Sequence, residues 1–174
     1  LRENHEIGVH VHPKEFGHDH DQLAELSRDR QAKLISTTRE AIADAVDCDP
    51  DQIQSFRAGR HSASEETIDV LRNLGFEVDA SVHVRYDDYL PESITRRNDP
   101  FEWGGLVEVP TSFTRLPILS RCGPRGVVTA TANALRTDSW LCSGERAIHH
   151  LLNASQVVSM YMHPYDATDY HDSI

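Results

Sequence analysis

The chain has 174 residues, of which 39% are hydrophobic and 26% are charged, with only 9 glycines and 8 prolines. Its length predicts a single domain over residues 1–174, and its composition excludes collagen-like, low-complexity and broadly disordered proteins. No apolar run approaches the roughly 20 residues that span a bilayer, and residues 1–8 lack the pattern of a signal peptide. We therefore expect a folded cytoplasmic protein without a membrane partner.

The charge balance is strongly acidic, with 28 Asp and Glu residues against 17 Lys and Arg residues and a formal net charge of -11. This charge repels nucleic acid phosphates, and no basic stripe interrupts it, so we expect no nucleic acid partner. Acidic residues spread along a whole chain are typical of halophile-like proteins, although an ordinary acidic protein has the same signature. The composition leaves a homo-oligomer open.

The first predicted element is a strand, because residues 5–12 (HEIGVHVH) alternate with a period of two. The apolar residues of this segment fall on one face, and His10 and His12 fall on the other. Residues 19–46 then carry apolar side chains at helical spacing without Gly or Pro, until Pro50 follows. This pattern predicts a long helix directly after the first strand.

Residues 53–58 alternate again and predict a second, short strand. The pattern Ser62-x-x-Glu65 is a capping box, which predicts the start of an amphipathic helix that ends at Gly75. Residues 86–104 are polar and contain two prolines, so we expect mostly loop there. The remaining predicted elements are strands at residues 76–84, 106–110 and 156–163 and a helix at residues 144–152.

Strands that alternate with helices predict an α/β fold, with βα units around a parallel sheet or barrel. In such folds functional groups gather where the strands end at their carboxyl side. His12 closes the first strand, Arg57 lies near the end of the second, and His163 ends the last. We therefore expect these three side chains to converge at one edge. Glu108, inside the strand at 106–110, is interpreted as an exposed edge charge without a function.

His10 and His12 are the candidate metal ligands. Residues i and i+2 of a strand project from the same face and can present two imidazoles to one cation. On spacing alone, a chance pair of surface histidines explains the pattern better than a metal site does.

Four parts of the chain share features with one known family. They are HEIGVHVHP (residues 5–13), RAGRH (57–61) with LGFEVDASV (74–82), LVEVP (106–110) and YMHP (161–164). In this order they resemble motifs of the polysaccharide deacetylase family, also called the NodB-homology domain. The resemblance extends over nearly the whole chain, although each motif alone has little specificity.

The resemblance implies a distorted seven-stranded (β/α) barrel and a hydrolase that removes acetyl groups from sugars with a divalent metal, usually zinc. The family's T-F-D-D-G motif, which normally precedes the histidine motif, has no counterpart here. We therefore expect an N-terminally incomplete barrel of the polysaccharide deacetylase type, with an exposed edge at the first strand. This chain alone would also lack the expected catalytic aspartate.

By the same resemblance, His10 is a metal ligand, His163 is the general acid, and Arg57 with Asp79 orients the base. The family spaces its ligands as H-x-x-x-H, which would put the second at Lys14. Here the nearest histidine is His12, so either the ligand has moved or the site binds metal differently. This chemistry needs a metal-bound water to attack the amide carbonyl and an acid to protonate the departing amine.

Structural alternatives stand beside these roles. Arg57 and Asp79 can form a buried ion pair, and His163 can be a strand-end histidine bonded to the backbone. For the whole protein we expect a metal-dependent hydrolase of an N-acetylated saccharide or related amide. The alternatives are a non-catalytic carbohydrate-binding relative and a small acidic metal-binding regulator, which needs only the two histidines of the first strand.

Overall fold

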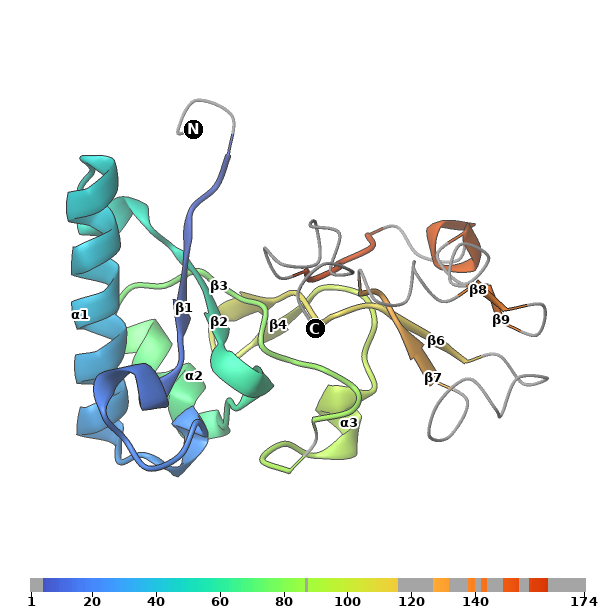
Figure 1. The fold of residues 1–174 in the computed structure, drawn as a ribbon, viewed down its shortest axis with the longest axis horizontal. Coiled ribbons are helices and arrows are strands. Elements are labelled where there is room, and N and C mark those ends of the chain that lie inside the picture. The colour runs from blue at the N-terminus through green and yellow to red at the C-terminus, as the bar shows by residue number, and fades with distance from the viewer. Residues whose placement is uncertain are drawn as a thin grey trace, which may run out of the picture. The chain divides into compact units, whose positions relative to one another are not determined.

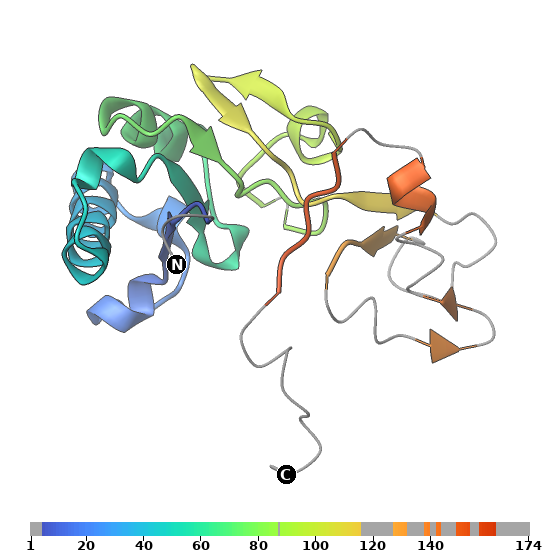
Figure 2. The same cartoon turned by 90° about the horizontal axis from the view of Figure 1, so that it is seen from above.

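The computed structural model (Figures 1 and 2) divides into two compact units, Leu1–Pro110 and Thr111–Ile174. The residues that it describes are 5–86, 88–115, 127–131, 138–139, 142–143, 149–153 and 157–162. The single-domain organisation of the whole chain stays a prediction.

The first unit is built on a five-stranded sheet with the strand order β1-β2-β3-β5-β4. Four strands are parallel to their neighbours, and β4 is antiparallel to β5. The strands are β1 Gly8–Val11, β2 Ser55–Ala58, β3 Val78–Asp79, β4 Phe101–Trp103 and β5 Leu106–Glu108. The predicted α/β class with a mainly parallel sheet is confirmed. Strand β1 is one edge of this sheet, as expected.

The period-two pattern of β1 produces two different faces. Val9 pairs in register with Phe56 of β2, and both side chains are buried. The next pair in register, His10 and Arg57, lies on the opposite face. His10 is exposed there. The apolar face therefore anchors β1 in the core, while the polar face presents its histidines.

Two longer helices pack beside this sheet. Helix α1 (Arg28–Val46) contacts β1 and helix α2 (Glu65–Asn73), as Figure 1 shows. The prediction that the first helix begins at residue 19 is wrong, because Leu23–Glu25 forms a separate 3-10 turn, η2, and Ser27 is extended. Leu23 and Leu26 are buried three residues apart, a spacing that also occurs in a helix. Other 3-10 turns are η1 Pro13–Phe16, η3 Pro50–Gln52 and η4 Gly59–His61.

Helix α2 is confirmed, but its cap lies two residues later than predicted. Ser64 Oγ accepts from the Thr67 amide at 3.3 Å, and Thr67 Oγ1 accepts from the Ser64 amide at 3.0 Å. Ser62 has another use, since its Oγ accepts from the Ala24 amide at 3.2 Å. The predicted stop is confirmed: Gly75 follows the helix with a φ of 76°.

The segment predicted as loop contains two short elements, α3 (Glu92–Thr95) and β4. Strand β4 forms a hairpin with β5 through Gly104 and Gly105, whose φ angles are 59° and 87°. Two consecutive positive φ angles are what a tight hairpin turn requires. The two consecutive glycines are the sequence signal for this hairpin, and the prediction of a loop did not include it.

The second unit contains two antiparallel pairs, β6 (Phe113–Arg115) with β7 (Val127–Thr129) and β8 (Asp138–Ser139) with β9 (Cys142–Ser143). Residues 149–153 are helical, in agreement with the described part of the predicted helix. The predicted last strand is reduced, in residues 157–162, to one isolated parallel bridge between Thr131 and Tyr161. His163 lies outside the described residues. In the described part of the chain, no helix has the length and apolar character needed to cross a membrane.

Candidate functional site

The two candidate metal ligands lie side by side at the carboxyl end of β1. The Nε2 atoms of His10 and His12 are 3.1 Å apart, and the two rings are nearly perpendicular, with an interplanar angle of 83°. We call these two side chains the histidine pair. The i, i+2 spacing in the sequence therefore produces two imidazoles that converge on one point.

The outer nitrogen of each ring is held by an acceptor. His10 Nδ1 donates to the Arg57 carbonyl oxygen at 2.9 Å, and His12 Nδ1 donates to Asp21 Oδ2 at 2.8 Å. Because a carbonyl and a carboxylate only accept, both Nδ1 atoms carry the hydrogen. The two Nε2 lone pairs then face each other, an arrangement that requires a shared proton or a cation between them.

Asp21 connects the histidine pair to its surroundings. Its Oδ1 accepts from the Lys14 amide at 3.3 Å, and its Oδ2 also lies 3.4 Å from Arg60 Nε. Burial raises the pKa of Asp21, but the hydrogen bonds from His12 and Lys14 outweigh burial, so this pKa lies below its ordinary value. Asp21 is therefore an ionised acceptor that fixes the tautomer and orientation of His12. Sequence reasoning missed it, because it lies in the segment predicted as helix.

Gly59 allows β2 to approach the histidine pair. A Cβ at this position would lie 2.4 Å from the Val11 carbonyl oxygen and 2.8 Å from His12 Nδ1. Both distances are shorter than atoms of a folded protein tolerate, and the first is to backbone. The glycine of the RAGRH motif is therefore required by the packing of His12.

The next two residues have strained backbones. Arg60 and His61 have φ angles of 56° and 54°, a region that costs non-glycine residues on the order of 1 kcal/mol each. Two hydrogen bonds hold the turn. His61 Nδ1 donates to the Ser81 carbonyl oxygen at 3.1 Å, and the Ser62 amide donates to the Gly59 carbonyl oxygen at 3.1 Å. Strain of this kind often occurs at functional sites, because the surrounding structure must maintain it.

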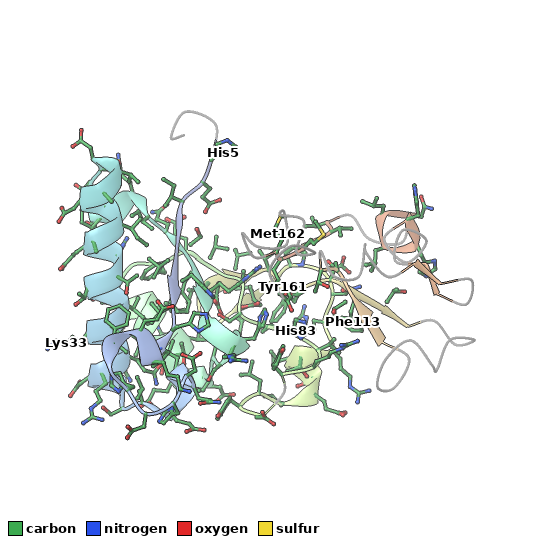
Figure 3. The ribbon with its side chains drawn as sticks, in the orientation of Figure 1. His5, Lys33, His83, Phe113, Tyr161 and Met162 are labelled. Atoms are coloured by element: carbon green, nitrogen blue, oxygen red, sulfur yellow. The ribbon has the colours of Figure 1, made fainter. Side chains whose placement is uncertain are left out.

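Three rings gather behind this turn: His61, His83 and Tyr86. Their centroids are 4.6 to 5.3 Å apart, and His61 stacks on Tyr86 with an interplanar angle of 15°. His83, labelled in Figure 3, is buried. Its burial, helped by the positive charges of His61 and Arg85, lowers its pKa to about 3, so it is neutral. His83 lies inside the segment 76–84 that was predicted as a strand, and the sequence prediction gave it no role.

Two carboxyl groups pair deep in the sheet, where Asp79 of β3 is in register with Glu108 of β5. We call them the carboxyl pair. Both residues are 0% exposed, so the interpretation of Glu108 as an exposed edge charge is wrong. The reason is the strand order: β5 lies between β3 and β4 and is not an edge.

Each member of the carboxyl pair has one satisfied oxygen. Asp79 Oδ1 accepts from the Ser81 hydroxyl at 2.5 Å, and Glu108 Oε1 accepts from the Val82 amide at 2.9 Å. Asp79 Oδ2 and Glu108 Oε2 are buried and make no hydrogen bond of good geometry within the described structure. Burial raises the pKa of both groups, and the neighbouring Asp79 charge raises that of Glu108 further. Because two like charges cannot both remain buried and ionised, the pair keeps a proton at neutral pH.

The structural alternative for Arg57 and Asp79, a buried ion pair between them, is wrong for the described structure. Arg57 Nε donates to the Ala80 carbonyl oxygen at 2.9 Å, whereas Asp79 is in register with Phe56 and faces the core. Consecutive residues of a strand project from opposite faces. Arg57 follows Phe56, so its side chain lies on the face opposite to Asp79, which pairs with Phe56. Arg57 acts on Asp79 through its charge, which lowers the pKa of that carboxyl against the effect of burial. Their role in orienting a base stays a prediction.

The structure therefore brings together His10, His12 and the backbone of Arg57, and it places Asp79 on the other face of the sheet. His163 lies outside the described residues, so its convergence with the other candidates stays a prediction. Lys14, at the position where the resemblance expects a second histidine, lines a pocket instead. Within the described ranges, no group of three or more His, Cys, Asp or Glu side chains is placed to hold a metal ion.

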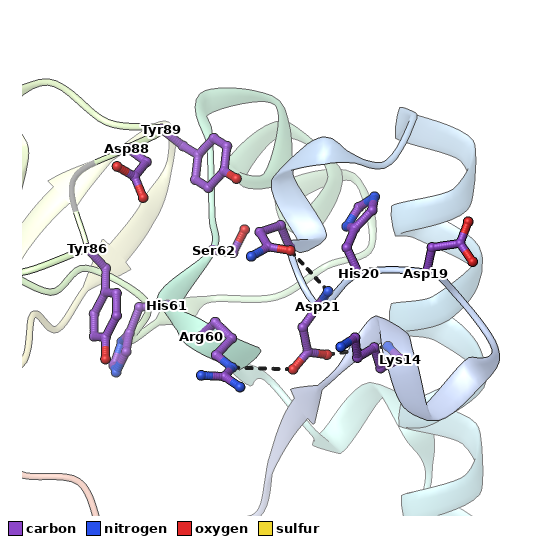
Figure 4. A pocket seen from close by; sticks show the side chains of 11 residues that line it. Lys14, Asp19, His20, Asp21, Arg60, His61, Ser62, Tyr86, Asp88 and Tyr89 are labelled. Atoms are coloured by element: carbon purple, nitrogen blue, oxygen red, sulfur yellow. Dashed lines mark hydrogen bonds and ion pairs between the residues drawn. The ribbon is translucent and has the colours of Figure 1, made fainter.

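A pocket of about 530 Å³ lies next to Asp21 (Figure 4). We call it the rim pocket. All its lining residues follow the carboxyl ends of three parallel strands: Lys14, Asp19, His20, Asp21 and Gln22 after β1, Arg60, His61 and Ser62 after β2, and Tyr86, Asp88 and Tyr89 after β3. This is the edge of a parallel sheet where ligands of α/β proteins bind.

Comparison of the chain with protein-family models, with curated proteins and with solved structures found no match.

Proposed function

We propose that this protein is a metal-dependent hydrolase that removes acetyl groups from an N-acetylated saccharide, in the manner of the polysaccharide deacetylases. The observation that carries the proposal is the histidine pair, whose two Nε2 atoms lie 3.1 Å apart while each Nδ1 is bound to an acceptor. For the fold, we propose that the five-stranded sheet is part of an incomplete, distorted (β/α) barrel. The parallel strands and the polar groups at their carboxyl ends support this interpretation.

The donor set of the pair fits a zinc ion. Zinc binds neutral imidazole nitrogens at about 2.0–2.1 Å, and two nitrogens 3.1 Å apart can both reach one ion at that distance. Metal-bound histidines usually donate their other N–H to a carboxylate or a carbonyl, as His12 does to Asp21 and His10 does to Arg57. Catalytic zinc sites use three protein ligands, so a third ligand has to come from outside the described residues.

The chemistry divides between the metal and the chain. A zinc ion supplies Lewis acidity and lowers the pKa of a bound water. Asp21 keeps the Nε2 lone pair of His12 directed at the ion, because it holds the proton on Nδ1. By the resemblance, we propose His163 as the general acid that protonates the departing nitrogen. Arg57 and Asp79 keep their proposed role in orienting the base, with Arg57 acting through its charge.

Zinc binding by the full-length protein tests this proposal. We expect one zinc ion per chain by metal analysis and calorimetry, and loss of measurable binding in both His10→Ala and His12→Ala. His5→Ala is the matched control, since His5 is exposed on the same segment before the strand, as Figure 3 shows. Wild-type zinc content in the double variant His10→Ala/His12→Ala would refute the site.

Catalysis is tested by acetate release from an N-acetylated oligosaccharide, expressed per bound zinc. A positioned general acid contributes about 10²- to 10⁴-fold, so His163→Ala should lower kcat by that order at unchanged zinc content. Wild-type turnover of this variant would remove His163 from the mechanism.

A non-catalytic carbohydrate-binding relative is the second candidate. The observation that favours it is the lack of a three-ligand metal group in the described part of the chain. This candidate predicts saccharide binding with no acetate release at any zinc concentration.

A further inference from the structure

We propose that Ser81 is a positioning residue for the histidine pair, because it fixes both ends of the strained turn against which His10 and His12 are oriented. The effect of Ser81 on metal binding rests on the proposed function. Its effect on the orientation of the two rings follows from the hydrogen bonds of the described residues and does not depend on that function.

Ser81 holds the chain on both sides of the turn that follows β2. It lies two residues after β3 and is 0% exposed. Its hydroxyl oxygen accepts a hydrogen bond from the amide of Ala58, the last residue of β2, at 2.9 Å. Its carbonyl oxygen accepts from Nδ1 of His61, the last residue of η4, at 3.1 Å. One buried residue therefore connects β3 to both ends of the turn.

The chain between these two bonds contacts each imidazole of the histidine pair in a different way. The Arg57 carbonyl oxygen is the acceptor for His10 Nδ1 at 2.9 Å. Gly59 lies so close to the other ring that a Cβ there would be 2.8 Å from His12 Nδ1. Ala58, whose amide is held from the β3 side, lies between these two contacts. A displacement of Ala58 would therefore change the acceptor of one ring and the packing of the other.

The backbone of the turn needs an external anchor. Arg60 and His61 have φ angles of 56° and 54°, which non-glycine residues keep only where surrounding contacts impose them. The bond between the Ser62 amide and the Gly59 carbonyl oxygen lies within the turn, so it does not connect the turn to the sheet. Without the bonds to Ser81, relaxation of the two φ angles would move the turn away from the histidine pair.

The direction of the Ser81 hydroxyl group is also determined. Because its oxygen accepts from the Ala58 amide, its hydrogen has to point elsewhere, and it is donated to Asp79 Oδ1 at 2.5 Å. Asp79 and Ser81 are both 0% exposed, so water cannot replace either partner. Position 81 therefore requires a side chain that donates and accepts at once. Through this one hydroxyl group, the carboxyl pair in the interior is joined to the segment that orients the histidine pair.

Zinc affinity of the full-length protein is the first test. We expect Ser81→Ala to lower zinc affinity roughly 10-fold, at the lower end of the effect of groups that orient metal ligands. The loss is not larger because Arg57 Nε still bonds the Ala80 carbonyl oxygen at 2.9 Å and holds the segment in part. Ser81→Thr keeps the hydroxyl group and should restore most of the affinity. Ser81→Cys keeps the size of the side chain but is only a weak donor and acceptor, so it should give an intermediate affinity.

Thr67→Ala is the matched control for a lost buried hydroxyl group. Thr67 is also 0% exposed, and its hydroxyl donates to Gln31 Oε1 at 2.9 Å. Thr67 lies on α2 and has no bond to the turn after β2 among the described contacts. This variant should lose stability and keep the zinc affinity of the wild type. Wild-type zinc affinity in both Ser81→Ala and Ser81→Cys would overturn the proposal.

A measurement without metal tests the orientation of the rings directly. In ¹⁵N NMR spectra of the wild type, His10 should carry its hydrogen on Nδ1, because the Arg57 carbonyl oxygen accepts it. In Ser81→Ala we expect the hydrogen to be distributed between Nδ1 and Nε2, while the signals of the exposed His5 do not change. If Ser81 served stability alone, Ser81→Ala would unfold more easily and keep the wild-type tautomer of His10, and this result would overturn the proposal.

The two proposals fail separately. A change of the His10 tautomer in Ser81→Ala, in a protein whose histidine pair binds no zinc, would refute the proposed function and support the role of Ser81. Zinc binding that requires His10 and His12 and is unchanged in Ser81→Ala would refute the role of Ser81 and support the function.

Discussion

The histidine pair and the carboxyl pair are two pairs of neighbouring titratable side chains on the same sheet. Each places two titratable groups on neighbouring positions, and each must avoid a conflict between them. The histidines lie at the exposed end of β1, and each ring is tied to an acceptor through its outer nitrogen. The carboxyls lie between β3 and β5 at 0% exposure, with one oxygen each left without a hydrogen bond of good geometry in the described structure.

The two pairs differ in their access to a ligand from solution. The conflict between the two Nε2 lone pairs can be relieved by a cation from solution, because His10 is exposed. The repulsion between the carboxylates of Asp79 and Glu108 is relieved by retaining a proton, because both side chains are 0% exposed and a cation from solution cannot reach them. The first pair is therefore suited to binding, and the second makes stability depend on pH.

The largest expected effect comes from closing the space beside the histidine pair. Gly59→Ala would place a methyl group 2.4 Å from the Val11 carbonyl oxygen, so β1 and β2 must separate or the ring of His12 must move. We expect a loss of about 3 kcal/mol in the free energy of unfolding, measured with urea. Gly17→Ala is the control for the loss of a glycine in an open position, since no atom lies within 4 Å of its Cβ. Gly17→Ala is itself destabilising, because the φ of this position is 84°. If Gly59→Ala lost no more stability than Gly17→Ala, the packing argument would be contradicted.

Removing the charge of Asp21 should weaken the histidine pair without unfolding it. Asp21→Asn keeps the shape of the side chain but no longer offers a carboxylate to His12 Nδ1. We expect zinc affinity to fall about 10- to 100-fold, measured by competition with a chelating dye. Asp19→Asn, another acidic residue of the rim pocket, should leave zinc affinity unchanged. Equal affinity in Asp21→Asn and wild type would show that Asp21 does not position His12.

The carboxyl pair predicts a pH-dependent stability. Because burial raises the pKa of Glu108 and Asp79, the native state holds more protons than the unfolded chain above the ordinary glutamate value of 4.5. The free energy of unfolding must then fall as pH rises through that range. Glu108→Gln removes one titrating group and keeps the acceptor for the Val82 amide. We expect this variant to be more stable than wild type at pH 8, by roughly 1–2 kcal/mol, and to have a flatter pH profile.

Thermal and urea unfolding between pH 5 and pH 8 measure this profile. Glu102→Gln is the control, because it removes an exposed carboxyl from the neighbouring strand β4. A wild-type stability that rises over this range and a variant that is less stable at pH 8 would show that the pair is ionised.

The smallest expected effect comes from relieving backbone strain in the turn after β2. Arg60→Gly relieves a φ of 56° and should stabilise the protein by about 1 kcal/mol, since the lost contact with Asp21 is long and exposed. Asp47→Gly is the matched change, because Asp47 ends helix α1 with a φ of 54°. Both variants should gain stability by a similar amount. Destabilisation by Arg60→Gly would mean that the arginine side chain holds the turn.

The parts of the fold that the sequence predicted well are those with local causes. The period-two alternation of residues 5–12 placed Val9 in the core and directed His10 and His12 to one side, because strand geometry alone determines this. The amphipathic pattern of α2 and its stop at Gly75 are local in the same sense.

The remainder of the site depends on contacts between distant segments. Asp21 reaches His12 only because the chain turns back through η1 Pro13–Phe16 instead of entering a helix. Glu108 is buried because β4 adds outside β5, an order that no period in residues 106–110 reveals. The separation of Arg57 from Asp79 follows from the register between β2 and β3. Local patterns determine which face a side chain takes on its own strand, and they do not determine what lies beside that face.

The pairing of β1 with β2 also sets the order of events during folding. The His10 ring is oriented by a carbonyl group 47 residues away, across the whole length of α1. Contacts between parallel strands of such separation form slowly, because a long stretch of chain must be ordered before they can close. The β1 strand carries both imidazoles from the start, but the His10 ring has no acceptor to orient it until β2 has paired with β1. Metal uptake would therefore follow this docking step, and bound metal would slow the unfolding of the β1–α1–β2 unit.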